Sequence, residues 1–146
     1  MGLDNGIIIR GKTAKGINFL TRFHENYGGF SEDAYSGPGV YEIIYLRKCW
    51  NIRYKALSLG LLNDCCDDDG DRVLSITELN DVVDLFKYFL VEKNWQEDGD
   101  SIWQWHTILP HLAEAIRDIR YFLQEYEDED FDLSEEDFEI TFYDSY

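Results

Sequence analysis

Residues 138–143 read FEITFY, and this stretch decides the fold class because apolar and polar side chains alternate along it. Alternation with a period of two residues is typical of a β-strand with one buried face. A second strand is predicted near the other terminus, where Ile7, Ile8 and Ile9 form a β-branched run. Strands this short are marginal alone. We therefore expect the two terminal strands to pair in a small sheet.

Four segments between these strands have the apolar spacing of amphipathic helices. They cover residues 17–27, 40–62, 75–90 and 107–126. Ser75 and Glu78 form a capping box at the start of the third helix. Thr107, with Pro110 in the first turn, predicts the start of the fourth. The sequence therefore predicts an α+β fold: a mainly helical single domain over residues 1–146, with about four helices.

Charge is distributed unevenly along the chain. Residues 64–146 carry 25 acidic and 5 basic residues, a net charge of −20, whereas residues 1–63 carry 5 acidic and 8 basic residues, a net charge of +3. The total of −17 repels nucleic acid and anionic membrane surfaces, so we expect no direct binding to either. Aromatic residues are interspersed with the acids, unlike in a typical disordered acidic tail. The second half is therefore predicted to be folded.

The densest run of acids is our predicted partner-binding face. Its residues are Glu125, Glu127, Asp128, Glu129, Asp130, Asp132, Glu135, Glu136 and Asp137. Carboxylates at helical spacing can imitate a row of phosphates, and a basic partner would bind them rapidly and in a salt-sensitive way. We therefore expect a non-enzymatic protein that blocks a basic nucleic-acid-binding site by charge mimicry. The plainer interpretation is a solvated face, partly neutralised within the molecule by the basic segment 47–55.

The acidic stretch 67–78, DDDGDRVLSITE, can be aligned with the twelve-residue calcium loop of an EF-hand. The candidate ligands are Asp67, Asp69, Asp71, Ser75 and Glu78. Arg72 occupies the sixth position, where the sharp turn requires glycine. Glu78 also belongs to the capping box, and no second EF-hand loop accompanies this one. We favour an acidic turn before a capped helix, with Ca²⁺ as the alternative and no other cofactor.

A third hypothesis is a small-ligand pocket that binds or hydrolyses a nucleotide signal. The pocket would combine Arg47, Lys48, Arg53 and Lys55 with the glycine-rich loop 28–39. Catalytic motifs give it no support, because His106 and His111 are five residues apart and would not share a helix face. No catalytic residue is predicted.

The cysteines and the first residues bear on the compartment. Cys49, Cys65 and Cys66 do not form a disulfide framework, which favours a reducing environment. The first residues lack the basic region and cleavage site of a signal peptide. No apolar run approaches the roughly 20 residues of a membrane-spanning helix. We expect a cytoplasmic protein without membrane contact, whose oligomeric state does not follow from these features.

Three short motifs remain to be interpreted: Met1-Gly2-Leu3-Asp4, Tyr45-Leu46-Arg47-Lys48-Cys49 with Ile52, and Tyr143-Asp144-Ser145-Tyr146. Together they resemble a group of small uncharacterised phage and bacterial proteins. The group opens with MGLD, carries a YWRK-like helix and ends near Ser-Trp; here Leu46, Arg53 and Tyr146 replace its usual Trp, His and closing Trp. The resemblance implies a phage or mobile-element setting and terminal strands that lie together. With it, the expected partner becomes a host defence protein and the chain a phage antidefence protein.

Overall fold

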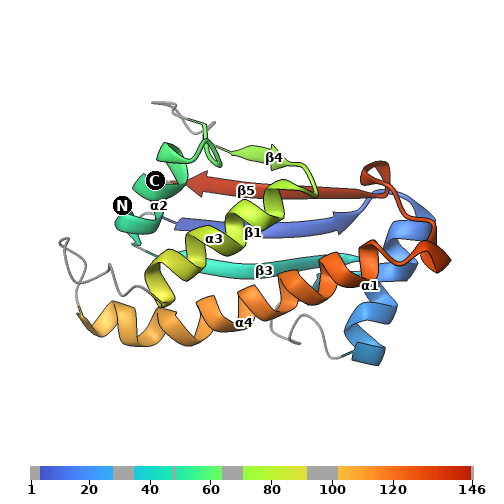
Figure 1. The fold of residues 1–146 in the computed structure, drawn as a ribbon, viewed down its shortest axis with the longest axis horizontal. Helices are drawn as coiled ribbons and strands as arrows, with labels where there is room; N and C mark the ends of the chain where they lie inside the picture. Colours follow the sequence, from blue (N-terminus) through green and yellow to red (C-terminus); the bar gives the residue numbers. More distant parts are fainter. Residues whose placement is uncertain (1–3, 28–34, 48, 64–70, 92–101, 146) are drawn as a thin grey trace.

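The structure, a computed structural model, describes residues 4–27, 35–47, 49–63, 71–91 and 102–145. Its strands are β1 (Asp4–Gly11), β2 (Tyr35–Gly37), β3 (Val40–Arg47), β4 (Arg72–Leu74) and β5 (Phe138–Ser145). Its α-helices are α1 (Ala14–Tyr27), α2 (Trp50–Ser58), α3 (Glu78–Leu90) and α4 (Ile102–Tyr126). Two short 3₁₀ turns, η3 (Glu129–Phe131) and η4 (Glu135–Asp137), follow α4 (Figure 1).

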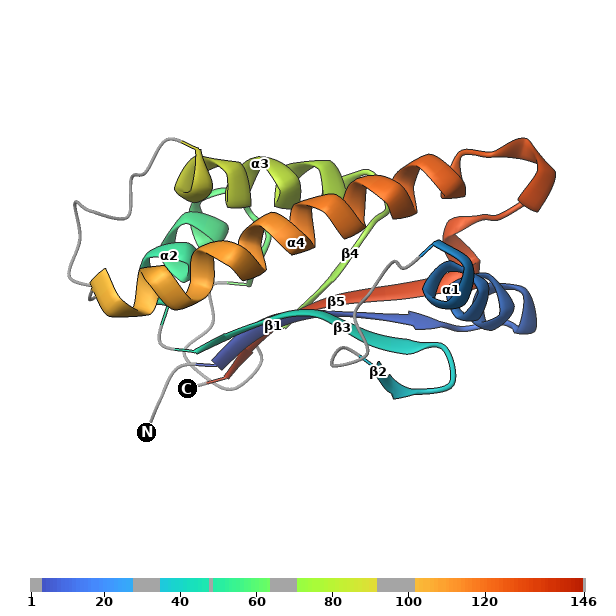
Figure 2. The same ribbon diagram turned by 90° about the horizontal axis from the view of Figure 1, so that it is seen from below.

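The strands form one antiparallel sheet in the order β2-β3-β1-β5-β4. Helices α2, α3 and α4 cover one face of this sheet, and α1 lies at its far end (Figure 2). The predicted α+β class is confirmed, with four α-helices among the described residues. The predicted pairing of the terminal strands is also confirmed, because β1 runs antiparallel to β5 from Asp4 opposite Ser145 to Gly11 opposite Phe138.

The predicted helix over residues 40–62 is wrong in its first half, which forms β3. A bulge explains the error: the register of β3 against β1 shifts, so that Ile7 lies opposite Ile44 but Ile8 lies opposite Glu42. Tyr41 and Ile44 are both buried although they are three residues apart, which imitates helical spacing. The second half was predicted correctly, since Ile52 and Ala56 form the buried side of α2.

The other predicted helices are present with shifted starts. The capping box of α3 is confirmed, because the Glu78 amide donates to the Ser75 hydroxyl (3.3 Å) and the Ser75 amide donates to the Glu78 carboxylate (3.1 Å). The predicted start of the last helix is wrong: α4 begins at Ile102, and Pro110 lies inside it. Proline removes one backbone donor there, yet the helix continues to Tyr126.

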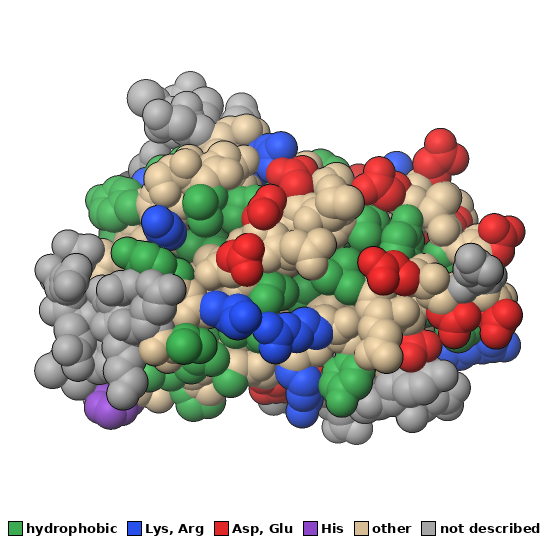
Figure 3. Space-filling model, in the orientation of Figure 1, with side chains coloured by type: hydrophobic (Ala, Val, Ile, Leu, Met, Phe, Trp, Pro, Cys, Tyr) green, Lys and Arg blue, Asp and Glu red, His purple; other side chains and the backbone are tan. Residues whose placement is uncertain are grey.

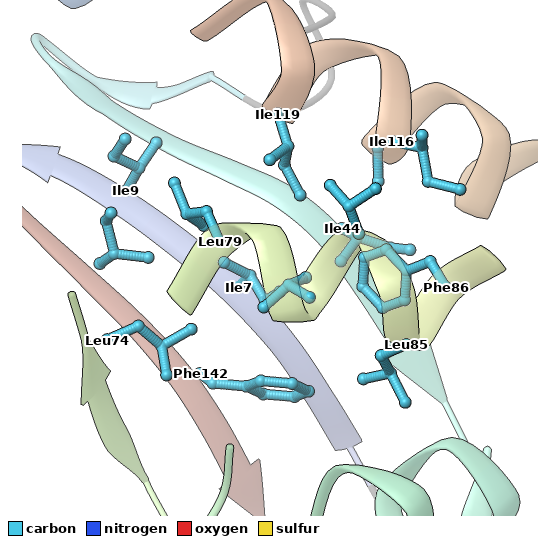
Figure 4. Close-up of a cluster of buried hydrophobic side chains, with 14 of the residues drawn as sticks. Ile7, Ile9, Ile44, Leu74, Leu79, Leu85, Phe86, Ile116, Ile119 and Phe142 are labelled. Carbon is cyan, nitrogen blue, oxygen red and sulfur yellow. The ribbon is translucent and has the colours of Figure 1, made fainter. Parts of the chain in front are cut away.

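The core lies between the sheet and the helices. Ile7, Ile9 and Ile44 of the sheet face α3 and α4, which contribute Leu79, Phe86 and Ile119 (Figure 4). A second part of the core, at the α1 end, is aromatic. Phe19 contacts the rings of Phe122, Phe131 and Phe138 edge-on, with ring centroids 5.5–5.7 Å apart. This aromatic cluster fixes the segment that joins α4 to β5, where most of the predicted acidic face lies.

Candidate functional site

Residues 127–137, called here the acidic turn, join α4 to β5 and are held at several points. Phe131 packs on Phe19, and Leu133 also lies against the core. Asp137 is buried and receives hydrogen bonds from the Thr13 hydroxyl (2.6 Å) and the Ser134 amide (2.9 Å). These bonds lower the pKa of Asp137, and the bond from Thr13 contributes most. Asp137 therefore anchors the turn and is not one of its exposed carboxylates, and a role for it in partner binding stays a prediction.

Three further carboxylates of the acidic turn have partners inside the protein. Glu135 accepts a hydrogen bond from the Ile76 amide (3.0 Å), which ties the turn to the start of α3. Asp128 accepts one from the Asp130 amide (3.0 Å). Asp132, in the left-handed region at φ 50°, lies 3.6 Å from the Lys15 ammonium. The acids of the turn therefore also determine its shape.

Six side chains of the predicted face remain exposed to solvent. They are Glu127, Asp128, Asp130, Asp132, Glu135 and Glu136. Glu125 is half-buried on α4, and the Glu129 side chain lies outside the described part of the structure. Acidic side chains gather over this end of the molecule and continue along α3 (Figure 3). The result is a set of carboxylates whose backbone is fixed by the core.

Ion pairs between the two halves of the chain account for part of the charge. Arg10 with Glu139, Lys15 with Asp132 and Arg53 with Asp144 each join a base of the first half to an acid of the second. The predicted internal neutralisation is therefore confirmed for Arg53. Lys55, in contrast, lies over the ring of Tyr88, 4.4 Å from its centroid.

The pair of Arg53 and Asp144 belongs to a buried polar cluster that also contains Asn5. Arg53 Nε donates to both Asp144 oxygens (3.0 and 3.1 Å), and Asn5 Nδ2 donates to Asp144 Oδ1 (2.6 Å). All three residues are less than 10 % exposed. The cluster joins the two terminal strands to α2.

Sequence reasoning missed Asn5 and Asp144, although a signal was present for Asp144. The alternation that defines β5 continues one step beyond Phe142 and places residue 144 on the buried face. A carboxylate on a buried strand face requires a partner. No such signal existed for Thr13, whose contact with Asp137 spans most of the chain.

The possible calcium loop is only partly described. Asp67 and Asp69 lie outside the described residues, and Asp71 accepts a hydrogen bond from the Asp144 amide (2.8 Å). Both oxygens of Glu78 are occupied, one by the Ser75 amide and one by the Arg72 guanidinium. Burial raises the pKa of Glu78, but these hydrogen bonds outweigh it and lower the pKa overall.

Within the described ranges no group of three acidic, His or Cys side chains is placed to hold a metal ion. Ser75 is also engaged, with Thr77 and with the Glu78 amide. Calcium binding therefore stays a prediction.

The proposed nucleotide pocket is not assembled by the described residues. β2, from the loop 28–39, pairs with Val40 and Tyr41, whereas Arg47 lies at the opposite end of β3. Arg53 is buried against Asp144 instead of facing a pocket. Residues 28–34 and Lys48 lie outside the described residues. Because β3 is a strand and not part of a helix, the basic side chains and the hairpin are separated by its length.

No protein-family model, curated protein or solved structure matches this chain. No helix in the described ranges has both the length and the apolar character needed to cross a bilayer.

Proposed function

We propose that this chain is a non-enzymatic binding protein whose acidic turn occupies the basic, nucleic-acid-binding site of another protein. One observation carries the proposal: the exposed carboxylates of the turn stand on a backbone fixed by Phe131, Glu135 and Asp137. A flexible acidic tail would lose conformational entropy on binding, whereas a fixed array is already ordered.

The charge of this surface supports a basic partner. Among the described residues, Lys15 is the one base within ion-pairing distance of a carboxylate of the acidic turn. Its pair with Asp132 is exposed. Exposed pairs are weak and easily screened. The surface therefore retains most of its negative potential, which steers a basic protein toward it and makes association sensitive to salt. Following the resemblance, the proposed setting is a bacterial cytoplasm and the proposed partner a host defence protein.

The test uses a triple variant that leaves the anchoring contacts in place. Glu127→Gln, Asp130→Asn and Glu136→Gln remove three charges from the turn. Asp81→Asn, Asp84→Asn and Glu114→Gln, on α3 and α4, remove the same charge elsewhere and form the matched control. Wild-type protein is used to capture a partner from bacterial lysate at low salt, and duplex DNA and RNA are added as competitors.

We expect nucleic acid and salt each to release the captured protein. We expect the turn variant to bind it at least about tenfold more weakly, and the control to stay within about twofold, because charges outside the interface contribute little. Unchanged binding by the turn variant would contradict a role of the acidic turn. Failure of nucleic acid to compete would contradict mimicry.

A further inference from the structure

A hollow of about 440 Å³ opens between the last turns of α1 and the β2–β3 hairpin. Both elements lie at the same end of the sheet (Figure 2). The residues that line the hollow are Thr21, His24, Glu25, Tyr35, Pro38 and Tyr41. Its volume lies in the range of roughly 300–1,000 Å³ that is typical of small-ligand sites.

Three aromatic rings form one side of this hollow. The His24 ring is nearly parallel to that of Tyr35, with centroids 6.5 Å apart, and lies 5.3 Å from the ring of Tyr41. Tyr35 and Tyr41 meet at 5.8 Å. Tyr41 is buried and fixes the group to the core, whereas Tyr35 is 50 % exposed and offers its ring to a ligand. The aromatic group is thus anchored in the core through Tyr41 and open to solvent at Tyr35.

The polar groups of the hollow are suited to accept hydrogen bonds. The Thr21 hydroxyl donates its proton to the Ile17 carbonyl (2.9 Å), so only its lone pairs remain for a ligand. Glu25 is exposed, and no described Lys or Arg lies within ion-pairing distance of it. Burial raises the pKa of Tyr41, and nearby Tyr35 and Glu25 raise it further, so this phenol stays protonated. Glu25 is the carboxylate of the site.

We propose that this hollow binds an organic cation that carries a guanidinium or ammonium group. The face of an aromatic ring attracts a cation, and Glu25 supplies a matching negative charge beside the rings. An anion such as a nucleotide phosphate is disfavoured, because none of the described residues that line the hollow is Lys or Arg. The site is separate from the acidic turn. The residues that contact the acidic turn are Thr13, just before α1, and Lys15, at the start of α1. Thr21, His24 and Glu25 lie toward the other end of α1.

The cation can be a free small molecule or a side chain of a basic protein. The test is an NMR titration of the full chain with two guanidinium probes that each carry one positive charge, n-butylguanidine and N-acetyl-arginine methylamide. N-acetyl-citrulline methylamide is the uncharged control of nearly the same shape as the capped arginine. We expect saturable shifts at Tyr35 and Glu25 with the guanidinium probes, and binding of the citrulline probe weaker by at least about fivefold. Tighter binding of n-butylguanidine identifies a small-molecule source, and tighter binding of the capped arginine identifies a protein side chain.

Matched variants locate the site. We expect Glu25→Gln and Tyr35→Ala each to weaken binding by at least about fivefold, while Tyr35→Phe and the remote Glu136→Gln stay within about twofold. The pair Glu25→Gln and Glu136→Gln removes the same charge, and Tyr35→Phe keeps the ring should Tyr35→Ala fail to fold. The proposal is overturned if no saturable shift occurs, if citrulline binds as well as arginine, or if Glu136→Gln is as harmful as Glu25→Gln.

Discussion

The acidic turn and the buried polar cluster are both built on carboxylates, at opposite extremes of solvation. Glu136 is exposed on the turn, whereas the side chain of Asp144, eight residues later, is 0 % exposed and paired with Arg53. An exposed carboxylate is stabilised by water and has little effect on folding. A buried one loses that water and requires hydrogen bonds from fixed donors. Acids only eight residues apart can thus be solvated in one place and structural in the other.

The largest expected effect comes from breaking the buried cluster. Asp144→Ala leaves the Arg53 guanidinium buried without its carboxylate, which should lower the free energy of unfolding by about 3–5 kcal/mol. Urea denaturation followed by circular dichroism measures this. The control is the double variant Arg53→Met with Asp144→Leu, which we expect to be more stable than Asp144→Ala alone. If Asp144→Ala lowered the free energy of unfolding by less than about 1 kcal/mol, the ion pair would contribute little to stability.

The next effect concerns the close contact between α1 and η4. A Cβ atom at Gly16 would overlap with the carbonyl oxygen of Asp137. Gly16→Ala should therefore push the acidic turn away from α1 and lower the free energy of unfolding by about 1–3 kcal/mol. Thermal unfolding is the measurement, with Ala14→Gly, at the exposed start of the same helix, as the comparison. Equal stability of Gly16→Ala and wild type would mean that the turn can move freely.

A smaller effect is expected in the pH dependence of folding. The pKa of Asp137 is lower in the folded protein than the ordinary value near 4, so its contribution is complete above that value. The contribution is lost as the pH falls through the folded pKa. Asp137→Asn should therefore flatten the decline in unfolding free energy below about pH 4. Denaturant titrations at several pH values, with Asp130→Asn as control, test this; parallel curves would contradict it.

The smallest effect on stability is expected on the exposed face. Glu127→Gln, Asp130→Asn and Glu136→Gln should each change the free energy of unfolding by no more than about 0.5 kcal/mol. Thermal unfolding at low and high salt measures this. If a variant were markedly more stable than the wild type at low salt, repulsion between these charges would strain the turn. The exposed carboxylates would then oppose folding, in contrast to the buried carboxylate of Asp144.

Local patterns predicted the elements whose own apolar side chains are regularly spaced. The stripe on α3, its Ser75–Glu78 capping box and the alternation of β5 were all predicted from spacing alone. β3 was not, because a bulge in its pairing with β1 places Tyr41 and Ile44 on the same side. Pairing across 30 to 43 residues leaves no mark in the local spacing, and the helical interpretation was the natural one.

The candidate sites divide in the same way. Composition and charge were sufficient to identify an acidic surface near residues 125–137. Tertiary contacts with Thr13, Lys15 and Ile76 decided which parts of that stretch hold the turn in place. The hollow beside Tyr35 was not predicted at all, since α1 and the hairpin meet there only after folding.

Residue types and their order were therefore enough to predict the α+β class, the pairing of the two terminal strands and the excess of negative charge. Apolar periodicity follows from residue order and net charge from composition, and neither depends on which distant segments meet. Folding is what makes Asp144 and Asp137 internal while Glu136 and Asp130 face water. Burial depends on which distant segments meet, and a carboxylate becomes structural only where donors from those segments replace its water.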